Sequence, residues 1–156
     1  MNLAFFPTQG RLAGIDYGTV RIGVAVSDES RIVASPFENY QRRSTQADAD
    51  YFRKLVESEQ IVGFVVGLPI HNSGRESQKS EEARRFGHWL RDITDRPVTF
   101  HDERFSSVQA QQLLGDADMT RNKRRKRLDQ VAASIILASF LESHCHQTAS
   151  PGALDD

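Results

Sequence analysis

One stretch of the chain, residues 12–27, constrains the fold more than any other. Its sequence is LAGIDYGTVRIGVAVS. The apolar residues before Tyr17 predict a strand, and Gly18 with Thr19 predicts a tight turn. Beyond the turn, large apolar residues alternate with small ones, which predicts a second strand with one large-residue face and one small-residue face. The chain is therefore expected to begin with two neighbouring strands joined by the turn.

Asp16 is the exception inside this apolar pattern. An ionised carboxylate in an apolar strand is costly unless it is paired or bound to a cation. The glycines nearby let a backbone or a ligand approach closely. Asp16 is therefore a candidate functional residue. The alternative is that it is a turn residue that caps Gly18 or Thr19.

The rest of the chain alternates strand and helix patterns. A short third strand is expected at Arg31 to Ala34, ended by Ser35-Pro36. The later elements are a helix opening at Ser44-Thr45-Gln46, a strand over 61–66, a helix over 83–93 with a capping box at Ser73 and Glu76, a strand over 97–101, a helix from Ser106 or Ser107 to Leu114, and an apolar helix from near Leu128. This order predicts an α/β fold: a mixed five-stranded sheet, an antiparallel meander plus two parallel strands, with helices on both faces.

Length and composition set the domain organisation. The chain has 156 residues, so we expect one domain over residues 11–146, a flexible lead-in over 1–10 and a disordered tail over 147–156. The single cysteine, Cys145, excludes an internal disulfide and suits a reducing cytosol. Neither a signal peptide nor an apolar run of membrane-spanning length is found, so a cytoplasmic protein is expected.

Two further acidic residues and a basic run stand out. Glu103 lies just past a predicted strand, and Asp129 lies in the first turn of the last helix, directly after the basic run 121–127. If Asp16, Glu103 and Asp129 converge, they raise each other's pKa unless a cation lies between them. Hard oxygen ligands select Mg²⁺ or Mn²⁺. Two such ions about 4 Å apart activate a water and stabilise the leaving oxygen of a phosphodiester, and the basic run would hold the phosphates.

Each of these features also has a simpler interpretation. Asp129 can complement a helix dipole, and Glu103 can pair with Arg104. A basic run is usually a solvated face, and the net charge of −1 gives no global signal for nucleic-acid binding. The metal-site hypothesis therefore depends on the joint occurrence of the three acidic residues.

Several motifs resemble those of the YqgF/RuvX family, in the same order, over residues 11–143. They are Gly14-Ile15-Asp16-Tyr17-Gly18-Thr19, Arg21-Ile22-Gly23-Val24-Ala25-Val26-Ser27-Asp28, Val65-Val66-Gly67-Leu68-Pro69, Asp102-Glu103-Arg104-Phe105-Ser106-Ser107 and Asp129-Gln130-Val131-Ala132-Ala133. The chain departs from many relatives at Val20, where they have lysine, and in the loop His71-Asn72-Ser73-Gly74.

The resemblance implies a ribonuclease H-like fold and a divalent-metal phosphodiesterase with Asp16, Glu103 and Asp129 as the metal-binding triad. The family was first described as Holliday junction resolvases and is now more often described as the nuclease that processes the 5′ end of pre-16S rRNA. We therefore expect a Mg²⁺- or Mn²⁺-dependent endonuclease acting on structured RNA. Its expected phosphate contacts are Arg21, Arg104, Lys123, Arg124, Arg125, Lys126 and Arg127.

The resemblance also implies partners, and the residues leave alternative functions open. The expected partners are precursor rRNA, ahead of junction DNA, with a ribosomal particle and a homodimer as further candidates and no membrane. One alternative is a resolvase of four-way DNA junctions, which should be a two-fold dimer. A second is a sugar-kinase or actin-like ATPase, which shares the Asp-x-Gly-Thr pattern but needs two duplicated lobes. A third is a non-catalytic nucleic-acid-binding factor in transcription or ribosome assembly.

Overall fold

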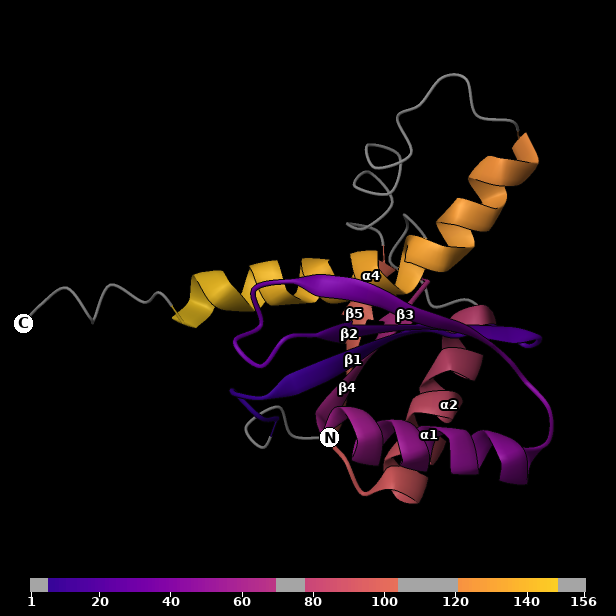
Figure 1. Ribbon diagram of the computed structural model, residues 1–156, viewed down its shortest axis with the longest axis horizontal. Coiled ribbons are helices and arrows are strands. Elements are labelled where there is room, and N and C mark those ends of the chain that lie inside the picture. The colour runs from indigo at the N-terminus through magenta and orange to yellow at the C-terminus, as the bar shows by residue number, and fades with distance from the viewer. Residues whose placement is uncertain (1–5, 70–77, 104–120, 149–156) are drawn as a thin grey trace, which may run out of the picture.

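The computed structural model describes residues 6–69, 78–103 and 121–148, and within the last range the side chains of residues 131–144 (Figure 1). Its elements are β1 (Arg11–Asp16), β2 (Arg21–Ser27), β3 (Ala34–Gln41), α1 (Thr45–Glu59), β4 (Ile61–Leu68), α2 (Gln78–Thr94), β5 (Val98–Asp102) and α4 (Arg121–Thr148). The predicted helix over 106–114 and the predicted capping box at Ser73 and Glu76 lie outside the described residues. The predicted domain boundaries stay a prediction.

The strands form one mixed sheet in the order β3-β2-β1-β4-β5. The three N-terminal strands are antiparallel to one another, and β4 and β5 run parallel to β1. In Figure 1, α1 and α2 lie on one side of the sheet and α4 lies on the other. The predicted fold class, a five-stranded mixed sheet with helices on both faces, is confirmed.

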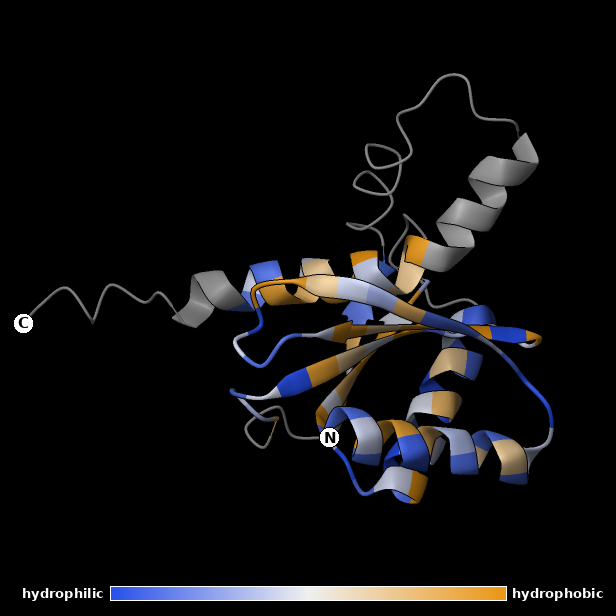
Figure 2. Cartoon of the chain, viewed as in Figure 1, coloured by the Kyte–Doolittle hydropathy of each residue, from blue (hydrophilic) through white to orange (hydrophobic). Residues whose placement is uncertain are grey.

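Each face of the sheet has its own apolar core, as the orange bands along the strands and inner helix faces of Figure 2 show. The alternation in the sequence assigns the faces. In β1, Ala13 and Ile15 pack in the core under α1 and α2, whereas Leu12 packs in the core under α4. The large residues of β2 also face α1 and α2, and its small Ala25 faces α4.

The small-residue face lets α4 lie very close to the sheet. A Cβ added at Gly14 would lie 2.7 Å from the Leu137 Cβ and 2.8 Å from the Ala133 carbonyl oxygen. The apolar residues of α4 are buried there over most of the helix circumference, as their spacing predicts, and only Ala138 among residues 133–141 is exposed. No helix in the described part of the chain is long and apolar enough to cross a membrane.

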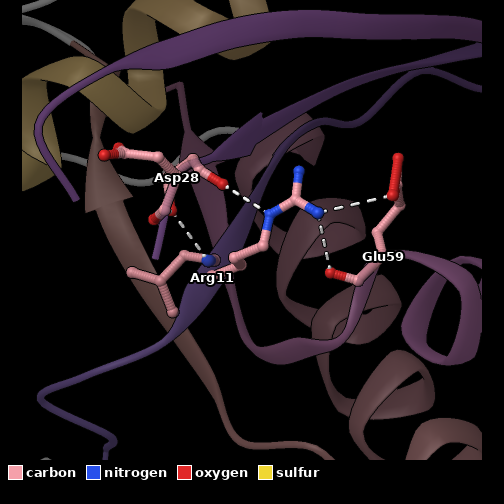
Figure 3. Close-up of polar contacts among 5 residues, drawn as sticks. Arg11, Asp28 and Glu59 are labelled. Atoms are coloured by element: carbon pink, nitrogen blue, oxygen red, sulfur yellow. Dashed lines mark hydrogen bonds and ion pairs between the residues drawn. The ribbon is translucent and has the colours of Figure 1, made fainter. Parts of the chain in front are cut away.

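Arg11, at the opposite end of β1 from Asp16, links the start of β1 to the ends of β2 and α1 (Figure 3). Its Nε donates to the Ser27 carbonyl at 2.9 Å, and its Nη1 donates to the Glu59 carbonyl at 3.1 Å and pairs with the Glu59 carboxylate at 3.4 Å. The Ser27 hydroxyl accepts from the Leu12 amide at 2.9 Å. Just before β1, Phe6 packs edge-on against Phe140 of α4, with ring centroids 5.8 Å apart.

The prediction for the third strand was wrong in its bounds. Residues 28–33 form a turn in which the Asp28 carboxylate accepts from the Ile32 and Val33 amides at 2.8 and 2.9 Å, and the strand begins only at Ala34. Pro36 lies inside it, opposite Ala25 at a shift in the register. An edge strand tolerates a proline at such an irregularity because one side of its backbone needs no partner.

The prediction for the last helix was also wrong at its start. Helix α4 begins at Arg121, so the basic run belongs to the helix and does not precede it. Arginine and lysine are good helix formers, and the helix period can therefore continue through a run without apolar residues. At its other end α4 reaches Thr148.

Candidate active site

The cavity that holds the candidate site has a volume of about 350 Å³ and lies where β1 and β4 end. Asp16 is the last residue of β1, and Glu103 directly follows β5. Because β1, β4 and β5 are parallel, their carboxyl ends meet at one edge of the sheet, where ligands bind in α/β proteins. The lining residues include Asp16, Tyr17, Gly18, Thr19, Val20, Arg21, Asn39, Gly67, Pro69, Lys79, Glu82 and Glu103.

Because Gly67 has no side chain, the Glu103 carboxylate has room to lie against the sheet on the side that α4 covers. A Cβ at Gly67 would overlap the Glu103 Oε1 and would lie 2.6 Å from the Ile136 Cδ1. Gly67 is the neighbour of Asp16 in the parallel pairing, since Ile15 pairs with Val66. Glycine at this position therefore allows Glu103 to lie across the end of β4 toward Asp16.

The electrostatics of Glu103 show that the two carboxylates interact. Burial raises the pKa of Glu103 to about 7, and the charges of Asp16 and Asp102 contribute to the increase. Lys79 acts in the opposite direction and lowers the pKa of the same carboxyl. The charged form of the partly buried Glu103 is disfavoured beside Asp16, and a cation between the two groups would relieve the repulsion.

The other predicted site residues are only partly described. Arg21 lines the cavity. Residue 129 lies in α4, one turn before Ala133, whose carbonyl lies against Gly14, but the Asp129 side chain lies outside the described residues. So do Arg104 and the side chains of Lys123, Arg124, Arg125, Lys126 and Arg127.

Comparison with known proteins shows which family the chain belongs to. A family model described as "RuvX: Holliday junction resolvase" matches residues 10–143. The chain belongs to this family. The match confirms the resemblance seen in the motifs, and the mixed sheet with helices on both faces agrees with the ribonuclease H-like fold that the resemblance implied.

Curated relatives match over most of the chain. A protein of Rhodopirellula baltica named "Putative pre-16S rRNA nuclease" is 46% identical, covering 97% of this chain and 93% of its own. A Rhodobacter capsulatus protein with the same name is 41% identical, covering 92% and 90%. Among solved structures, Thermus thermophilus RuvC in complex with Holliday junction substrate has a TM-score of 0.48 at 15% identity, covering 81% of this chain and 91% of that one.

Lys79 is one of the polar cavity residues, with Asn39 and Glu82, that sequence reasoning missed in this RuvX-family chain. It lies in the first turn of α2 and lines the cavity together with Glu82 and Ala83. The sequence pattern marked only the apolar face of this helix. The spacing of 79, 82 and 83 places the three residues on one helix face, so the buried Ala83 is the signal that could have pointed to Lys79.

A partly buried polar network contacts the Tyr17 hydroxyl, next to Asp16 in the chain. The Arg42 Nη1 donates to the Tyr17 hydroxyl at 3.0 Å, and the Arg42 Nε donates to Asp48 at 3.2 Å. Asp48 is 2% exposed and also accepts from the Tyr40 hydroxyl at 2.7 Å and the Arg43 amide at 3.0 Å. Burial alone would raise the pKa of Asp48, but these hydrogen bonds outweigh it and keep the pKa below its ordinary value.

We expect the metal-free protein to lose stability as the pH rises through the Glu103 titration. The pKa of Glu103 is about 7 in the folded protein against an ordinary 4.5, so between these values the folded state binds one more proton than the unfolded state. The free energy of unfolding therefore falls from about pH 4.5 to about pH 7. At pH 8, Glu103→Gln should be more stable than the parent by on the order of 2 kcal/mol, and the difference should disappear near pH 4.5.

Urea unfolding with chelator present, repeated between pH 4.5 and pH 8, measures this difference directly. Glu57→Gln, at an exposed position of α1, is the control for general charge removal. Parallel pH profiles for the parent and Glu103→Gln would show that Glu103 is not protonated at neutral pH and would contradict the expectation.

Proposed function

We propose that this chain is a divalent-metal-dependent endonuclease that processes the 5′ end of pre-16S rRNA. Membership of the RuvX family and the names of the relatives support a nuclease. The observation that carries the proposal is the placement of Asp16 and Glu103 in one cavity at the carboxyl ends of parallel strands. The carboxylates come from positions 87 residues apart (103 minus 16), so only the fold brings them together.

The residues of the cavity fit a divalent ion. Asp16 and Glu103 are hard oxygen donors of the kind that Mg²⁺ and Mn²⁺ prefer. Burial raises the pKa of Glu103, and the charge of Asp16 adds to the increase. Among the described side chains alone, no group of three His, Cys, Asp or Glu residues could hold a metal ion. We assign the third carboxylate to Asp129. One helical turn after residue 129, the Ala133 carbonyl of α4 lies against Gly14, and Gly14 is two residues before Asp16 in β1. A bound ion would activate a water and stabilise the leaving oxygen of a phosphodiester.

The chain's own residues would bind and position the substrate. Glu103 must give up its proton when a cation binds, so binding should improve as the pH rises toward 7. Lys79 and Arg21 line the same cavity and supply positive charge for a phosphate. Arg104 and the basic residues Lys123 to Arg127 are assigned the neighbouring phosphates of the strand.

The description of the family favours one other substrate, a four-way DNA junction. A resolvase would present two active sites to opposed strands as a two-fold dimer, whereas trimming one RNA end needs a single site. We place precursor rRNA first because the relatives over most of the chain carry that substrate in their names. We also assign the protein to the cytoplasm, where the ribosomal particle is the accompanying partner.

A side-by-side cleavage assay tests the proposal. The substrates are 16S rRNA with its 5′ extension, the mature 16S rRNA and a four-way DNA junction, each with Mg²⁺, with Mn²⁺ and with chelator. We expect cleavage of the precursor alone, and only with metal. Faster cleavage of the junction would assign the resolvase activity instead. Cleavage in chelator would refute the metal mechanism, and tight binding without turnover would point to a non-catalytic factor.

A further inference from the structure

A second cavity of about 260 Å³ adjoins the candidate active site. It lies between the start of α1 and one face of α2, the two helices on one side of the sheet in Figure 1. Its lining residues are Tyr17, Arg42, Thr45, Glu82, Arg85, Phe86 and Trp89. Tyr17 and Glu82 also line the cavity that contains Asp16 and Glu103, so the two cavities share a wall.

One face of α2 runs along both cavities. Lys79, Glu82 and Ala83 line the first cavity, and Glu82, Arg85, Phe86 and Trp89 line the second. These positions follow the three- and four-residue spacing that places side chains on one helix face. A polymer bound at the carboxylates can therefore continue along α2, past Glu82, into the second cavity.

The second cavity offers fixed positive charge. The Arg42 guanidinium is held by Asp48 and by the Tyr17 hydroxyl, and it lies 5.4 Å from the centroid of the Tyr17 ring. Its side chain is 27% exposed, so it is positioned by the fold yet reachable. Arg85 is exposed at the rim, and Glu82 is the one acidic residue among the lining residues. The Asp48 carboxylate offsets the charge of Arg42, so the cavity would bind a phosphate through the guanidinium donors of Arg42 and Arg85 and not through a net positive charge.

The same cavity offers an aromatic surface. Trp89 is half-buried, and its indole packs on Phe86 at 5.4 Å and on Phe52 at 6.4 Å between ring centroids. The indole also contributes to the cavity wall. A partly exposed indole beside arginines is the combination on which single-stranded nucleic acids stack their bases.

We propose that this cavity is a subsite for one nucleotide of the RNA strand that flanks the reactive phosphate, with the base on Trp89 and the phosphate between Arg42 and Arg85. The inference deepens the proposed function and rests on it. The carboxylate cavity would hold the bond that is cleaved, and the Trp89 subsite would fix the strand that leads to it.

Trp89 is the single tryptophan of the chain, so its fluorescence reports directly on the subsite. The full chain with Asp16→Asn, which should not cleave, is titrated with a twelve-nucleotide oligouridylate. We expect the oligonucleotide to quench Trp89 fluorescence. Arg85→Glu should weaken binding roughly tenfold and lower the slope of log K against log salt by about 0.7, the value for one lost phosphate contact on a single strand.

The matched control is Arg91→Glu, an equal charge change on the same helix at a residue outside the cavity, with a 43% exposed side chain. Arg91→Glu should bind the oligonucleotide as tightly as the parent, with the same quenching of Trp89 fluorescence. Arg85→Lys should keep most of the binding that Arg85→Glu loses. Equal weakening by Arg85→Glu and Arg91→Glu, or binding without quenching, would overturn the subsite while cleavage by the unmodified chain stands. Quenching with no cleavage of any substrate would support the subsite and overturn the proposed function.

Discussion

Replacing Asp16 with asparagine should abolish cleavage of the precursor rRNA and leave the fold intact. The substitution keeps the size of the side chain but removes the negative charge that faces Glu103 in the cavity. Charge stabilisation by a bound divalent ion is worth several kcal/mol in the transition state, so the cleavage rate should fall on the order of 10³-fold. The measurement is the single-turnover rate on 5′-extended 16S rRNA with saturating Mg²⁺.

Two controls separate this effect from damage to the fold. Asp50→Asn removes an equally charged group on α1 whose side chain is 67% exposed, and its rate should match that of the parent. In metal-free Asp16→Asn, the pKa of Glu103 should decrease because one of its raising charges is gone, which the pH profile of unfolding reports. A rate within a few-fold of the parent would remove Asp16 from the metal site.

Replacing Gly14 with alanine should cause the largest loss of stability. The new methyl group would lie 2.7 Å from the Leu137 Cβ and 2.8 Å from the Ala133 carbonyl oxygen, and neither a Cβ nor a backbone carbonyl can move without moving α4. Overpacking of a core typically costs 1–3 kcal/mol. We expect about 3 kcal/mol, or a decrease in Tm of about 10 °C for a domain of this size, measured by thermal and urea unfolding.

Gly63→Ala is the matched control on the same face of the sheet. Its methyl group would meet the outer atoms of the Phe6 ring at 3.1 Å and a Leu12 methyl at 3.2 Å, which are ends of side chains that can rotate away. It should cost less than 1.5 kcal/mol. If both variants lose the same free energy of unfolding, the close approach of α4 to β1 is not the reason that position 14 requires glycine.

The candidate site divides into a part that the sequence predicts and a part that it does not. Asp16 and Glu103 were recognisable because each is a carboxylate at the end of an apolar strand, and the topology then places both at one edge of the sheet. The signal for Lys79 is only indirect, its spacing from Ala83, since a lysine in the first turn of a helix is ordinary surface. Its effect on Glu103 arises only when α2 lies across the ends of the strands.

The sequence by itself determined the types and the order of the elements that the structure describes, because hydrophobic periodicity acts between near neighbours along the chain. It also determined that β2 has a small-residue face. Only the tertiary structure decided what covers that face and how Pro36 fits an edge strand. These outcomes depend on contacts between residues far apart in the chain, and a local pattern contains no term for the free energy of such contacts.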